Sequence, residues 1–252
     1  MIRKKRNKLG AKIRILVLNH VQEVNLGSYE TFFHSDKQHF KVYNFSSLKN
    51  PPLSDNFDAL WVMGGPMNVW EENRYPWLVQ EKLFIKNWVL NLKKPFFGIC
   101  LGHQLLGEAL GASVVESQSP EIGFKKIYVN RELPPNNLLR DFGQDIHVLQ
   151  GHSAEISNFS KKEVLVLASS DNCSIQALSY LNHAFSVQFH PEVDDETIQD
   201  WISIPKIKQD FCGALGPEGI AEILDYQKKN RRSLIKGAQI IYENWLNLIE
   251  KN

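Results

Sequence analysis

The sequence predicts an α/β fold: an open, mostly parallel sheet with helices on both faces, an antiparallel extension and a helical C-terminal extension. Short β-branched and aromatic runs recur along the chain, and helical patterns separate several of them. Several runs are apolar almost throughout. Such strands are typical of a sheet that is covered by helices on both sides.

The predicted strands are spread over the first three quarters of the chain. They are IRILVLN from Ile13, ALWVM from Ala59, PFFGI from Pro95, KKIYV from Lys125, IHVLQ from Ile146, VLVLAS from Val164, SIQALSY from Ser174 and AFSVQF from Ala184. Between about residues 123 and 189 strands outnumber helical patterns. We therefore expect the antiparallel extension of the sheet in this part of the chain.

Two helices are clear in the first half of the chain. One runs from Pro76 to Leu92, and Pro76 suits a first helical turn. The other runs from Leu101 to Leu110 and ends at Gly111. Both follow predicted strands, as expected of an alternating α/β arrangement.

The C-terminal part reads as a pair or trio of helices packed on the main domain. The segment DDETIQDWI after Val193 has the pattern of a capped helix start. A second helical stripe between Ser233 and Ile249 consists of Leu234, Ala238, Ile241, Trp245 and Leu248. The run KKNRR at Lys228–Arg232 is predicted to be an exposed connector between helices. The expected division is a basic flexible leader over 1–12, a main domain over 13–201 and a helical extension over 202–252.

Composition excludes several classes of protein. The 252 residues are 43% apolar and carry a net charge of +1, so a basic nucleic-acid-binding surface or an anionic membrane partner is not expected. The leader MIRKKRNKLGAK has no apolar stretch suited to export, and no later segment is long enough to cross a bilayer. Three cysteines at irregular spacing predict reduced thiols. A cytoplasmic protein is therefore expected.

Cys100 stands where an apolar strand ends and a helix begins, in the segment KPFFGICLGHQLLGEALGA. The small residues Gly98 and Gly102 on either side permit a sharp turn, which is the pattern of a nucleophile elbow. At a helix N-terminus the partial positive charge favours thiolate over thiol, and free N–H groups are available to an anion. An ordinary glycine turn is the alternative explanation of this motif.

His190 is the best candidate base for such a thiolate. In VQFHPEV it directly follows an apolar strand, and Glu192 lies two residues later, where an extended backbone would point both side chains the same way. The expected set is nucleophile Cys100, base His190 and orienting Glu192. A surface turn and a metal site formed by these three residues are the alternatives, and the absence of further Cys or His clustering argues against metal.

The other histidines fit a chemical role less well. His20, His34 and His39 are expected in loops or on the surface, and His147 and His183 are expected in turns or at the surface beside strands. His103 is expected within a helix, where it could either be packed in the core or take part in the chemistry.

A glycine turn supplies candidate donors for an oxyanion. In WVMGGPMNVW an apolar strand ends at Met63 and runs into Gly64-Gly65-Pro66, whose backbone N–H groups have no side-chain obstruction. The Gly65 and Leu101 N–H groups would together form an oxyanion hole. A plain strand-to-loop turn is the alternative, but all three motifs follow predicted strands, and open α/β sheets place their sites at that edge.

These three motifs resemble those of the class I, triad-type glutamine amidotransferases. FFGICLGHQLLGEALGA resembles the nucleophile segment, VMGGPMNV the oxyanion loop and VQFHPEV the His-Pro-Glu segment, in the same order over about residues 13–201. The runs GGPMNVWEENRYPWL, EIGF, QGHSAEI and LASSDNCSIQAL most resemble stand-alone GMP synthase-like amidotransferases. The resemblance implies a flavodoxin-like fold, with Cys100, His190 and Glu192 as catalytic residues.

The resemblance also implies a reaction and a set of substrate contacts. The Cys100 thiolate would attack the glutamine side-chain amide, release ammonia and leave a γ-glutamyl thioester for hydrolysis, without a metal or organic cofactor. Gln104, Gly64 and the backbone around Gly151 and His152 would line the substrate pocket. Ala154 departs from the family pattern, because relatives tend to carry an acidic residue shortly after this histidine.

No P-loop pattern for a nucleotide-using synthetase occurs in the sequence. Either the ammonia passes to a separate synthetase subunit, or the protein works alone as a glutaminase or on γ-glutamyl compounds. A γ-glutamyl peptidase and a catalytically silent binding protein on this fold are the alternatives, and a homo-oligomer is left open.

Overall fold

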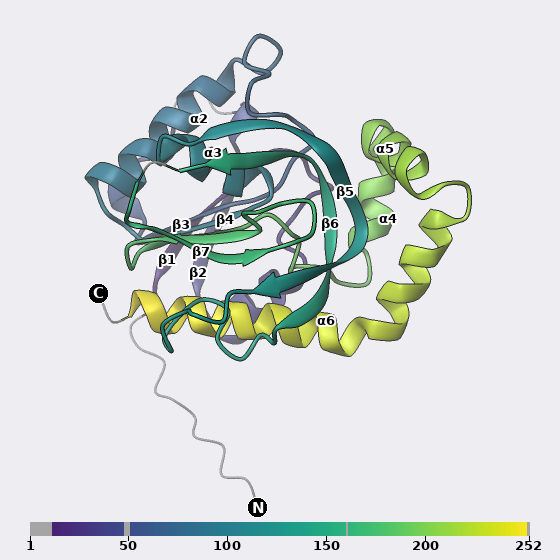
Figure 1. Ribbon diagram of the computed structural model, residues 1–252. Coiled ribbons are helices and arrows are strands. Elements are labelled where there is room, and N and C mark those ends of the chain that lie inside the picture. Colours follow the sequence, from purple (N-terminus) through teal and green to yellow (C-terminus); the bar gives the residue numbers. More distant parts are fainter. Residues whose placement is uncertain (1–11, 48–50, 160, 251–252) are drawn as a thin grey trace, which may run out of the picture.

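The computed structural model describes residues 12–47, 51–159 and 161–250 of the chain (Figure 1). Its centre is a nine-stranded mixed sheet with the strand order β2-β1-β3-β4-β9-β8-β7-β5-β6. The α/β prediction is confirmed. Most of the basic leader lies outside the described residues.

The parallel part of the sheet consists of five strands. They are β1 (Arg14–Asn19), β2 (His39–Asn44), β3 (Ala59–Val62), β4 (Phe96–Ile99) and β9 (Ala184–Val187). β3, β4 and β9 are buried along their whole length, which explains their continuous apolar runs. β2 was not predicted from the sequence. It is a half-exposed edge strand, HFKVYN, whose polar and charged residues weaken the apolar signal.

The antiparallel extension is confirmed, and two of its four strands, β5 and β6, are longer than predicted. It consists of β5 (Ser113–Val129), β6 (Asp145–Asn158), β7 (Val164–Ser169) and β8 (Ala177–Tyr180). β5 and β6 pair along most of their length, with irregular register between Glu116 and Glu121. Only one segment each of β5 and β6 was recognised in the sequence, because much of the rest of these two strands is polar. β7 has the predicted bounds, and β8 is shorter than the predicted run.

Three helices from the first half cover both faces of the sheet. They are α1 (Ser28–Ser35), α2 (Trp77–Lys86) and α3 (Leu101–Ala109). The predicted helix over Pro76–Leu92 is confirmed, and from Asn87 to Asn91 (η3) it continues as a π-helical turn. There the Trp88 Nε1–H donates to the Pro95 carbonyl at 3.0 Å. Short 3₁₀ turns lie at Phe45–Ser47 (η1) and Ser54–Asn56 (η2).

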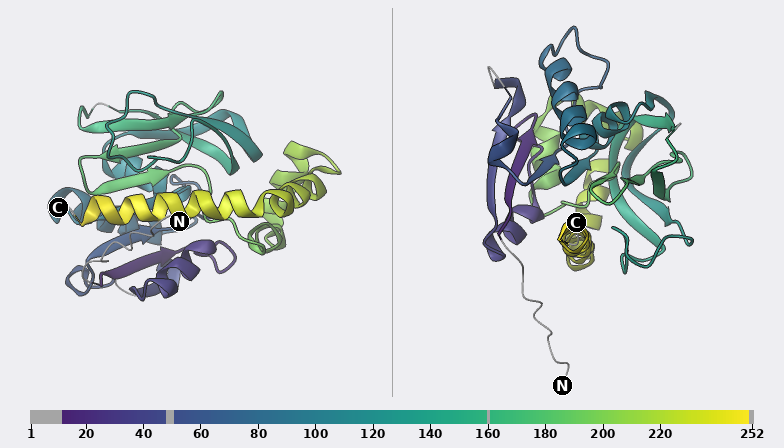
Figure 2. Two further views of the ribbon diagram at one scale, coloured as in Figure 1. Left: turned by 90° about the horizontal axis from the view of Figure 1, so that it is seen from below. Right: turned by 90° about the vertical axis from the view of Figure 1, so that its left-hand side faces the viewer.

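The C-terminal part contains α4 (Thr197–Ser203), α5 (Pro205–Leu215) and α6 (Gly219–Ile249). The predicted connector at Lys228–Arg232 is wrong, since this run lies inside the single 31-residue helix α6. Lys and Arg are good helix formers, and Lys229 pairs with Asp225 one turn earlier at 2.6 Å. The charge run therefore marks an exposed helix face. Figure 2 shows the N-terminal half of α6 extending beyond the sheet, next to α4 and α5.

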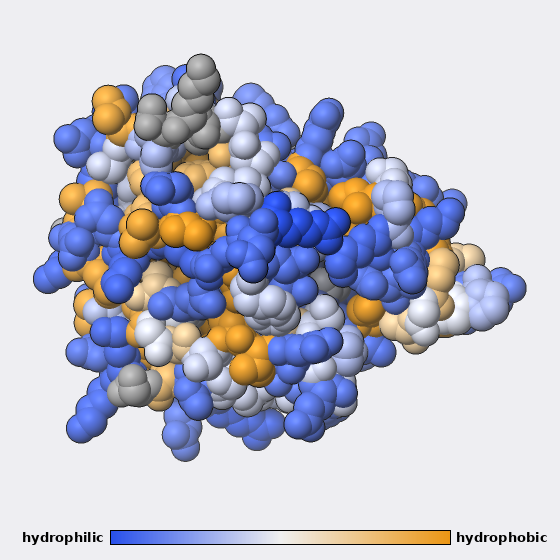
Figure 3. Space-filling view, turned by 90° about the horizontal axis from the view of Figure 1, so that it is seen from above, coloured by the Kyte–Doolittle hydropathy of each residue, from blue (hydrophilic) through white to orange (hydrophobic). Residues whose placement is uncertain are grey.

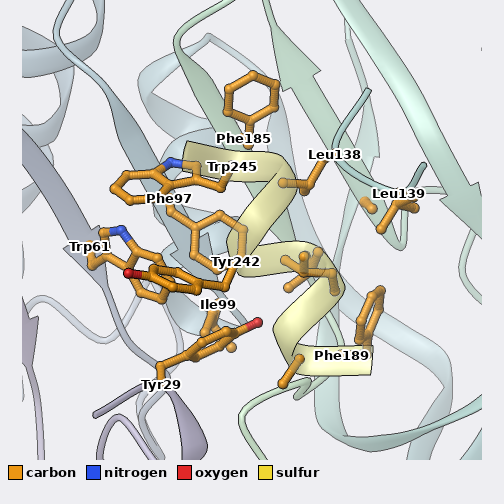
Figure 4. Packing of buried hydrophobic residues seen from close by; sticks show 14 of the residues in the cluster. Tyr29, Trp61, Phe97, Ile99, Leu138, Leu139, Phe185, Phe189, Tyr242 and Trp245 are labelled. Carbon is orange, nitrogen blue, oxygen red and sulfur yellow. The ribbon is translucent and has the colours of Figure 1, made fainter. Parts of the chain in front are cut away.

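The C-terminal half of α6 belongs to the hydrophobic core. Tyr242 and Trp245 lie over the sheet in a cluster with residues of α1 and of the central strands (Figure 4). The Trp245 ring meets the Trp61 ring edge to face, with centroids 5.0 Å apart. A second cluster on the other face packs beneath α2 and α3. Alternate residues of β1 point into the two clusters, which confirms that helices cover both faces.

The surface is mainly polar on the face shown in Figure 3, where apolar residues form small, separate groups. Among the helices that the structure describes, none has the length and apolar character needed to cross a membrane.

We predict that Trp245→Ala lowers the free energy of unfolding by about 3–5 kcal/mol, because it leaves a cavity between α6 and the sheet. Chemical denaturation measures this change. Trp70→Ala is the matched control, since Trp70 is 45% exposed and should change stability by no more than about 0.5 kcal/mol. Equal effects of the two substitutions would contradict the packing of α6 described above.

Candidate active site

Cys100 occupies a strained turn between β4 and α3. Its φ is 51°, a left-handed value that is unfavourable for a residue with a side chain, and it is the N-cap of α3. A Cβ on Gly102 would run into the Val62 carbonyl, and one on Gly98 would lie 2.5 Å from the Gly102 oxygen. The flanking glycines are therefore required because strand and helix approach each other so closely. The predicted strand–turn–helix elbow is confirmed.

His190 and Glu192 form a buried pair next to this elbow. They follow β9, the strand beside β4, and the His190 Nδ1 lies 2.6 Å from the Glu192 Oε1. The His190 backbone N–H donates to the Leu149 carbonyl at 2.9 Å, which fixes the turn against β6. The Trp201 ring packs edge-on against the imidazole, with centroids 4.3 Å apart. The ring of His190 therefore has one defined orientation.

Cys100 and His190 interact directly. Burial by itself lowers the pKa of His190, but the charges of Glu192 and Cys100 and hydrogen bonds to both raise this pKa to about 10. The protonated imidazole thus lies between a carboxylate and a sulfur. The structure brings together all three residues of the predicted set.

The glycine turn after β3 lies against the same residues. A Cβ built on Gly64 would be 3.0 Å from the His190 Cε1 and 3.6 Å from the Cys100 Cβ. A Cβ on Gly65 would be 3.1 Å from a methyl carbon of Leu101. Among the described residues, the Gly65 N–H has no acceptor. Leu101 is the first residue of α3, and the leading N–H groups of a helix have no intrahelical acceptor.

A cavity of about 400 Å³ opens in front of Cys100. Gly65, Leu101, Gln104, Gly151, His152 and His190 line it. Gly64, which was expected to contact the substrate, is not among the lining residues and lies against His190. The Gln104 Nε2 donates to the Ala154 carbonyl and to the Gln188 Oε1, both at 3.1 Å. The side chain of Gln104 is therefore held in place against the middle of β6.

A buried polar network behind the cavity centres on Glu121. The Glu121 Oε2 accepts hydrogen bonds from the His152 Nε2 at 3.2 Å, the Ser170 Oγ at 2.9 Å and the Gln176 Nε2 at 2.6 Å. The His152 Nδ1 lies 3.0 Å from the Ala154 carbonyl. The side chain of His152 thus links the middle of β6 to Glu121 of β5. Glu121 had no predicted role, because it lies before the strand that was predicted from Lys125.

The sequence did not predict that α4 and α5 form one wall of the cavity. Lys206, Ile207, Asp210 and Phe211 of α5 line it together with Trp201 of α4. These residues lie at helical spacing in a segment that was interpreted only as a packed extension. Nothing in their local pattern indicates a pocket, because the cavity forms only where α5 meets β5 and β6.

Two expectations about the other histidines were wrong. His20 and His183 are buried, not surface residues; the His183 Nε2 lies 2.9 Å from the Val89 carbonyl. His103 is packed: burial lowers its pKa to about 3, and its ring nitrogens contact Ser186 and the Ile175 carbonyl. Within residues 12–47, 51–159 and 161–250, no group of three or more His, Cys, Asp or Glu side chains has the arrangement of a metal site.

Comparison with known proteins identifies the family. Residues 19–202 match the family described as glutamine amidotransferase class-I. The chain belongs to this family. It is 38% identical to one subunit of the glutamine-hydrolyzing GMP synthase of Saccharolobus solfataricus over 138 residues, or 54% of this chain and 68% of that protein. It is 32% identical to the glutamine amidotransferase-like protein YfeJ of Salmonella typhimurium, over 76% of this chain and 81% of that protein.

Solved structures agree with this family assignment. A glutamine amidotransferase from Thermotoga maritima superposes with a TM-score of 0.81 and 25% identity, over 94% of this chain and 99% of the other. One from Methylobacillus flagellatus gives a TM-score of 0.82 at 21% identity, over 94% and 96% of the two chains, and supports the fold alone. The neighbours cover nearly the whole chain, including most of the C-terminal helices.

We predict that His190 titrates with a midpoint near pH 10 and that Glu192→Gln and Cys100→Ser each lower it. Either substitution removes a negative charge that favours the protonated imidazole. NMR of the imidazole signals measures the midpoint. Glu196→Gln is the control, because Glu196 is exposed and should leave the midpoint unchanged. A wild-type midpoint at the ordinary value of about 6.5 would contradict the arrangement described here.

Proposed function

We propose that this amidotransferase hydrolyses the side-chain amide of glutamine, with Cys100 as nucleophile, His190 as acid and base, and Glu192 as the residue that orients His190. The observation that carries the proposal is the convergence of Cys100 and His190 at one cavity from two separate turns, with Glu192 hydrogen-bonded to His190. A nucleophile, a base in contact with it and a third group that holds the base are the parts that covalent amide hydrolysis needs.

The reaction would proceed in two halves. The Cys100 thiolate attacks the amide carbon, and the resulting oxyanion accepts hydrogen bonds from the Gly65 and Leu101 N–H groups. The protonated His190 gives its proton to the departing nitrogen, so that ammonia and a γ-glutamyl thioester form. His190 then takes a proton from water, the resulting hydroxide attacks the thioester, and glutamate leaves with regeneration of the thiolate.

The substrate contacts follow from the cavity lining. Gln104 and the backbone at Gly151 and His152 would hold the glutamyl part of the substrate. The amide nitrogen would leave beside His190, which is hydrogen-bonded to Cys100. No metal or organic cofactor takes part in this scheme.

The ammonia would pass to a separate synthetase subunit. This proposal is supported by the relatives, because several of them are named as one subunit of a glutamine-hydrolyzing GMP synthase. The relative of this kind from Methanococcus aeolicus is 32% identical over 80% of this chain and 99% of its own length.

We predict that Cys100→Ser reduces ammonia release from glutamine by about 10³-fold or more, because the serine hydroxyl lacks the nucleophilicity of a thiolate. A coupled assay for ammonia or glutamate measures the rate. Cys212→Ser is the matched control, since Cys212 is an exposed free cysteine on α5 and should leave activity unchanged. Activity that survives in the Cys100 variant would refute the assigned nucleophile.

A second candidate function is hydrolysis of γ-glutamyl compounds larger than glutamine, such as γ-glutamyl peptides. The wall formed by α5 favours it, because the cavity of about 400 Å³ continues past the catalytic residues to Ile207 and Phe211. This volume falls in the range of pockets, about 300–1,000 Å³, that hold ligands larger than one amino acid.

If γ-glutamyl dipeptides are substrates, Ile207→Ala should raise the KM for an apolar dipeptide about 5–10-fold and leave the KM for glutamine unchanged, because only the dipeptide reaches α5. Steady-state kinetics with both substrates separate the two candidates. Ile220→Ala is the matched control: Ile220 is also partly buried in the same cluster, but it does not line the cavity. Glutamine turnover far above that of every dipeptide would exclude the second candidate.

A further inference from the structure

A buried His–Glu pair that the proposed reaction does not use lies behind the glycine turn. His20 follows β1, Glu81 lies on α2, and both side chains are fully buried. The His20 Nε2 lies 3.0 Å from the Glu81 Oε1 and 3.2 Å from the Oε2. The ring also stacks on Trp77, with centroids 5.6 Å apart and planes inclined by 22°. These contacts give the imidazole one position and one orientation.

The other ring nitrogen of His20 holds the glycine turn. The His20 Nδ1 lies 2.8 Å from the Gly64 carbonyl oxygen, which can only accept a hydrogen bond. The Glu81 carboxylate at the opposite nitrogen also accepts when ionised. The ring therefore satisfies both partners when both of its nitrogens carry protons. Burial lowers the pKa of His20, but the charge of Glu81 and hydrogen bonds to Glu81 and Gly64 outweigh this effect and raise it.

The Gly64 carbonyl and the Gly65 N–H belong to one peptide unit. No described peptide bond is cis, so the C=O and N–H of this unit point in opposite directions. With the carbonyl directed at His20, the N–H of Gly65 is directed away from His20. Gly65 lines the cavity together with Cys100 and Leu101. Donation from a charged ring to the carbonyl also polarises the peptide unit and makes its N–H a stronger donor.

We propose that His20, held by Glu81, is a positioning residue that fixes the Gly64–Gly65 peptide so that the Gly65 N–H stabilises the oxyanion. The inference rests on the proposed amide hydrolysis. His20 acts through the peptide and does not touch the substrate. Its loss should therefore lower kcat and leave substrate binding largely intact, because the oxyanion forms only during the reaction.

Two substitutions separate the two hydrogen bonds of the ring. The amide nitrogen of an asparagine lies close to the position of the His Nδ1, whereas that of a glutamine lies close to the Nε2. His20→Asn can therefore still donate to Gly64, and His20→Gln can only reach Glu81. Both His20 variants are measured in the wild-type background and in the Glu81→Gln background. In the second background, loss of His20 leaves no buried carboxylate without a partner.

We predict that His20→Gln lowers kcat for ammonia release by about 10–100-fold, less than the roughly 10²–10³-fold loss for a deleted oxyanion donor, because the Gly65 N–H remains but is poorly aimed. His20→Asn should keep a kcat at least about 5-fold above that of His20→Gln. KM should change by no more than about 2-fold in either variant, because the donor acts after binding. Glu81→Gln alone should lower kcat by about 3–10-fold, since the ring stays in place but loses its charge.

The rate at which iodoacetamide alkylates Cys100 is a control for general damage to the site, because such damage would change this rate. S-alkylation forms no oxyanion, so its rate in His20→Gln should stay within about 2-fold of wild type. An alkylation rate that falls in proportion to kcat would overturn the positioning role. An unchanged kcat in His20→Gln would also overturn it, and so would equal losses of kcat in His20→Asn and His20→Gln. Circular dichroism checks the fold, and a His20 variant that does not fold leaves Glu81→Gln as the deciding variant.

The failure of this inference can be distinguished from the failure of the proposed function. A wild-type chain that is alkylated at Cys100 but releases no ammonia from glutamine would refute the proposed function. An active wild-type chain whose kcat does not depend on His20 or Glu81 would refute only the role of His20.

Discussion

The left-handed backbone at Cys100 is the constraint on which the site depends. A non-glycine residue in this conformation costs about 1–2 kcal/mol, and the surrounding packing must offset that cost. α3 lies so close to β4 and to Val62 of β3 that neither Gly98 nor Gly102 has room for a Cβ. The tight crossing places Cys100 at the start of a helix.

The order of the strands then brings the partners of Cys100 to it. β4 lies between β3 and β9, and all three strands are parallel, so their carboxyl ends meet at one edge of the sheet. The loop after β3 delivers Gly64 and Gly65, and the loop after β9 delivers His190 and Glu192. β9 is the last strand in the sequence but lies at the centre of the sheet. Residues some 90 positions apart therefore become neighbours, as open α/β sheets require of their sites.

Three buried His–Glu pairs surround the cavity in the described part of the chain. They are His190–Glu192, His20–Glu81 and His152–Glu121. Removing one partner leaves the other buried polar group without its hydrogen bond, which typically costs about 1–3 kcal/mol. Each pair holds a different part of the site: the proposed base, the glycine turn and the middle of β6. Buried His–Glu hydrogen bonds thus define the orientation of groups that apolar packing alone would leave free to turn.

The sequence by itself determined the strand–elbow–helix at Cys100, the His190–Glu192 spacing and the glycine turn at Gly64, because each depends on residues close together in the chain. It also predicted the α/β class, since buried parallel strands leave continuous apolar runs. Only the tertiary structure decided that His20 is a buried ring beneath the Gly64 carbonyl and that α5 closes the cavity over β5 and β6. Those contacts join residues tens of positions apart, and local patterns of polarity carry no information about such distant partners. The sequence also failed to predict the structure at Lys228–Arg232. Packing of the flanking turns extends a helix through this charge run, whereas its local pattern is typical of a connector.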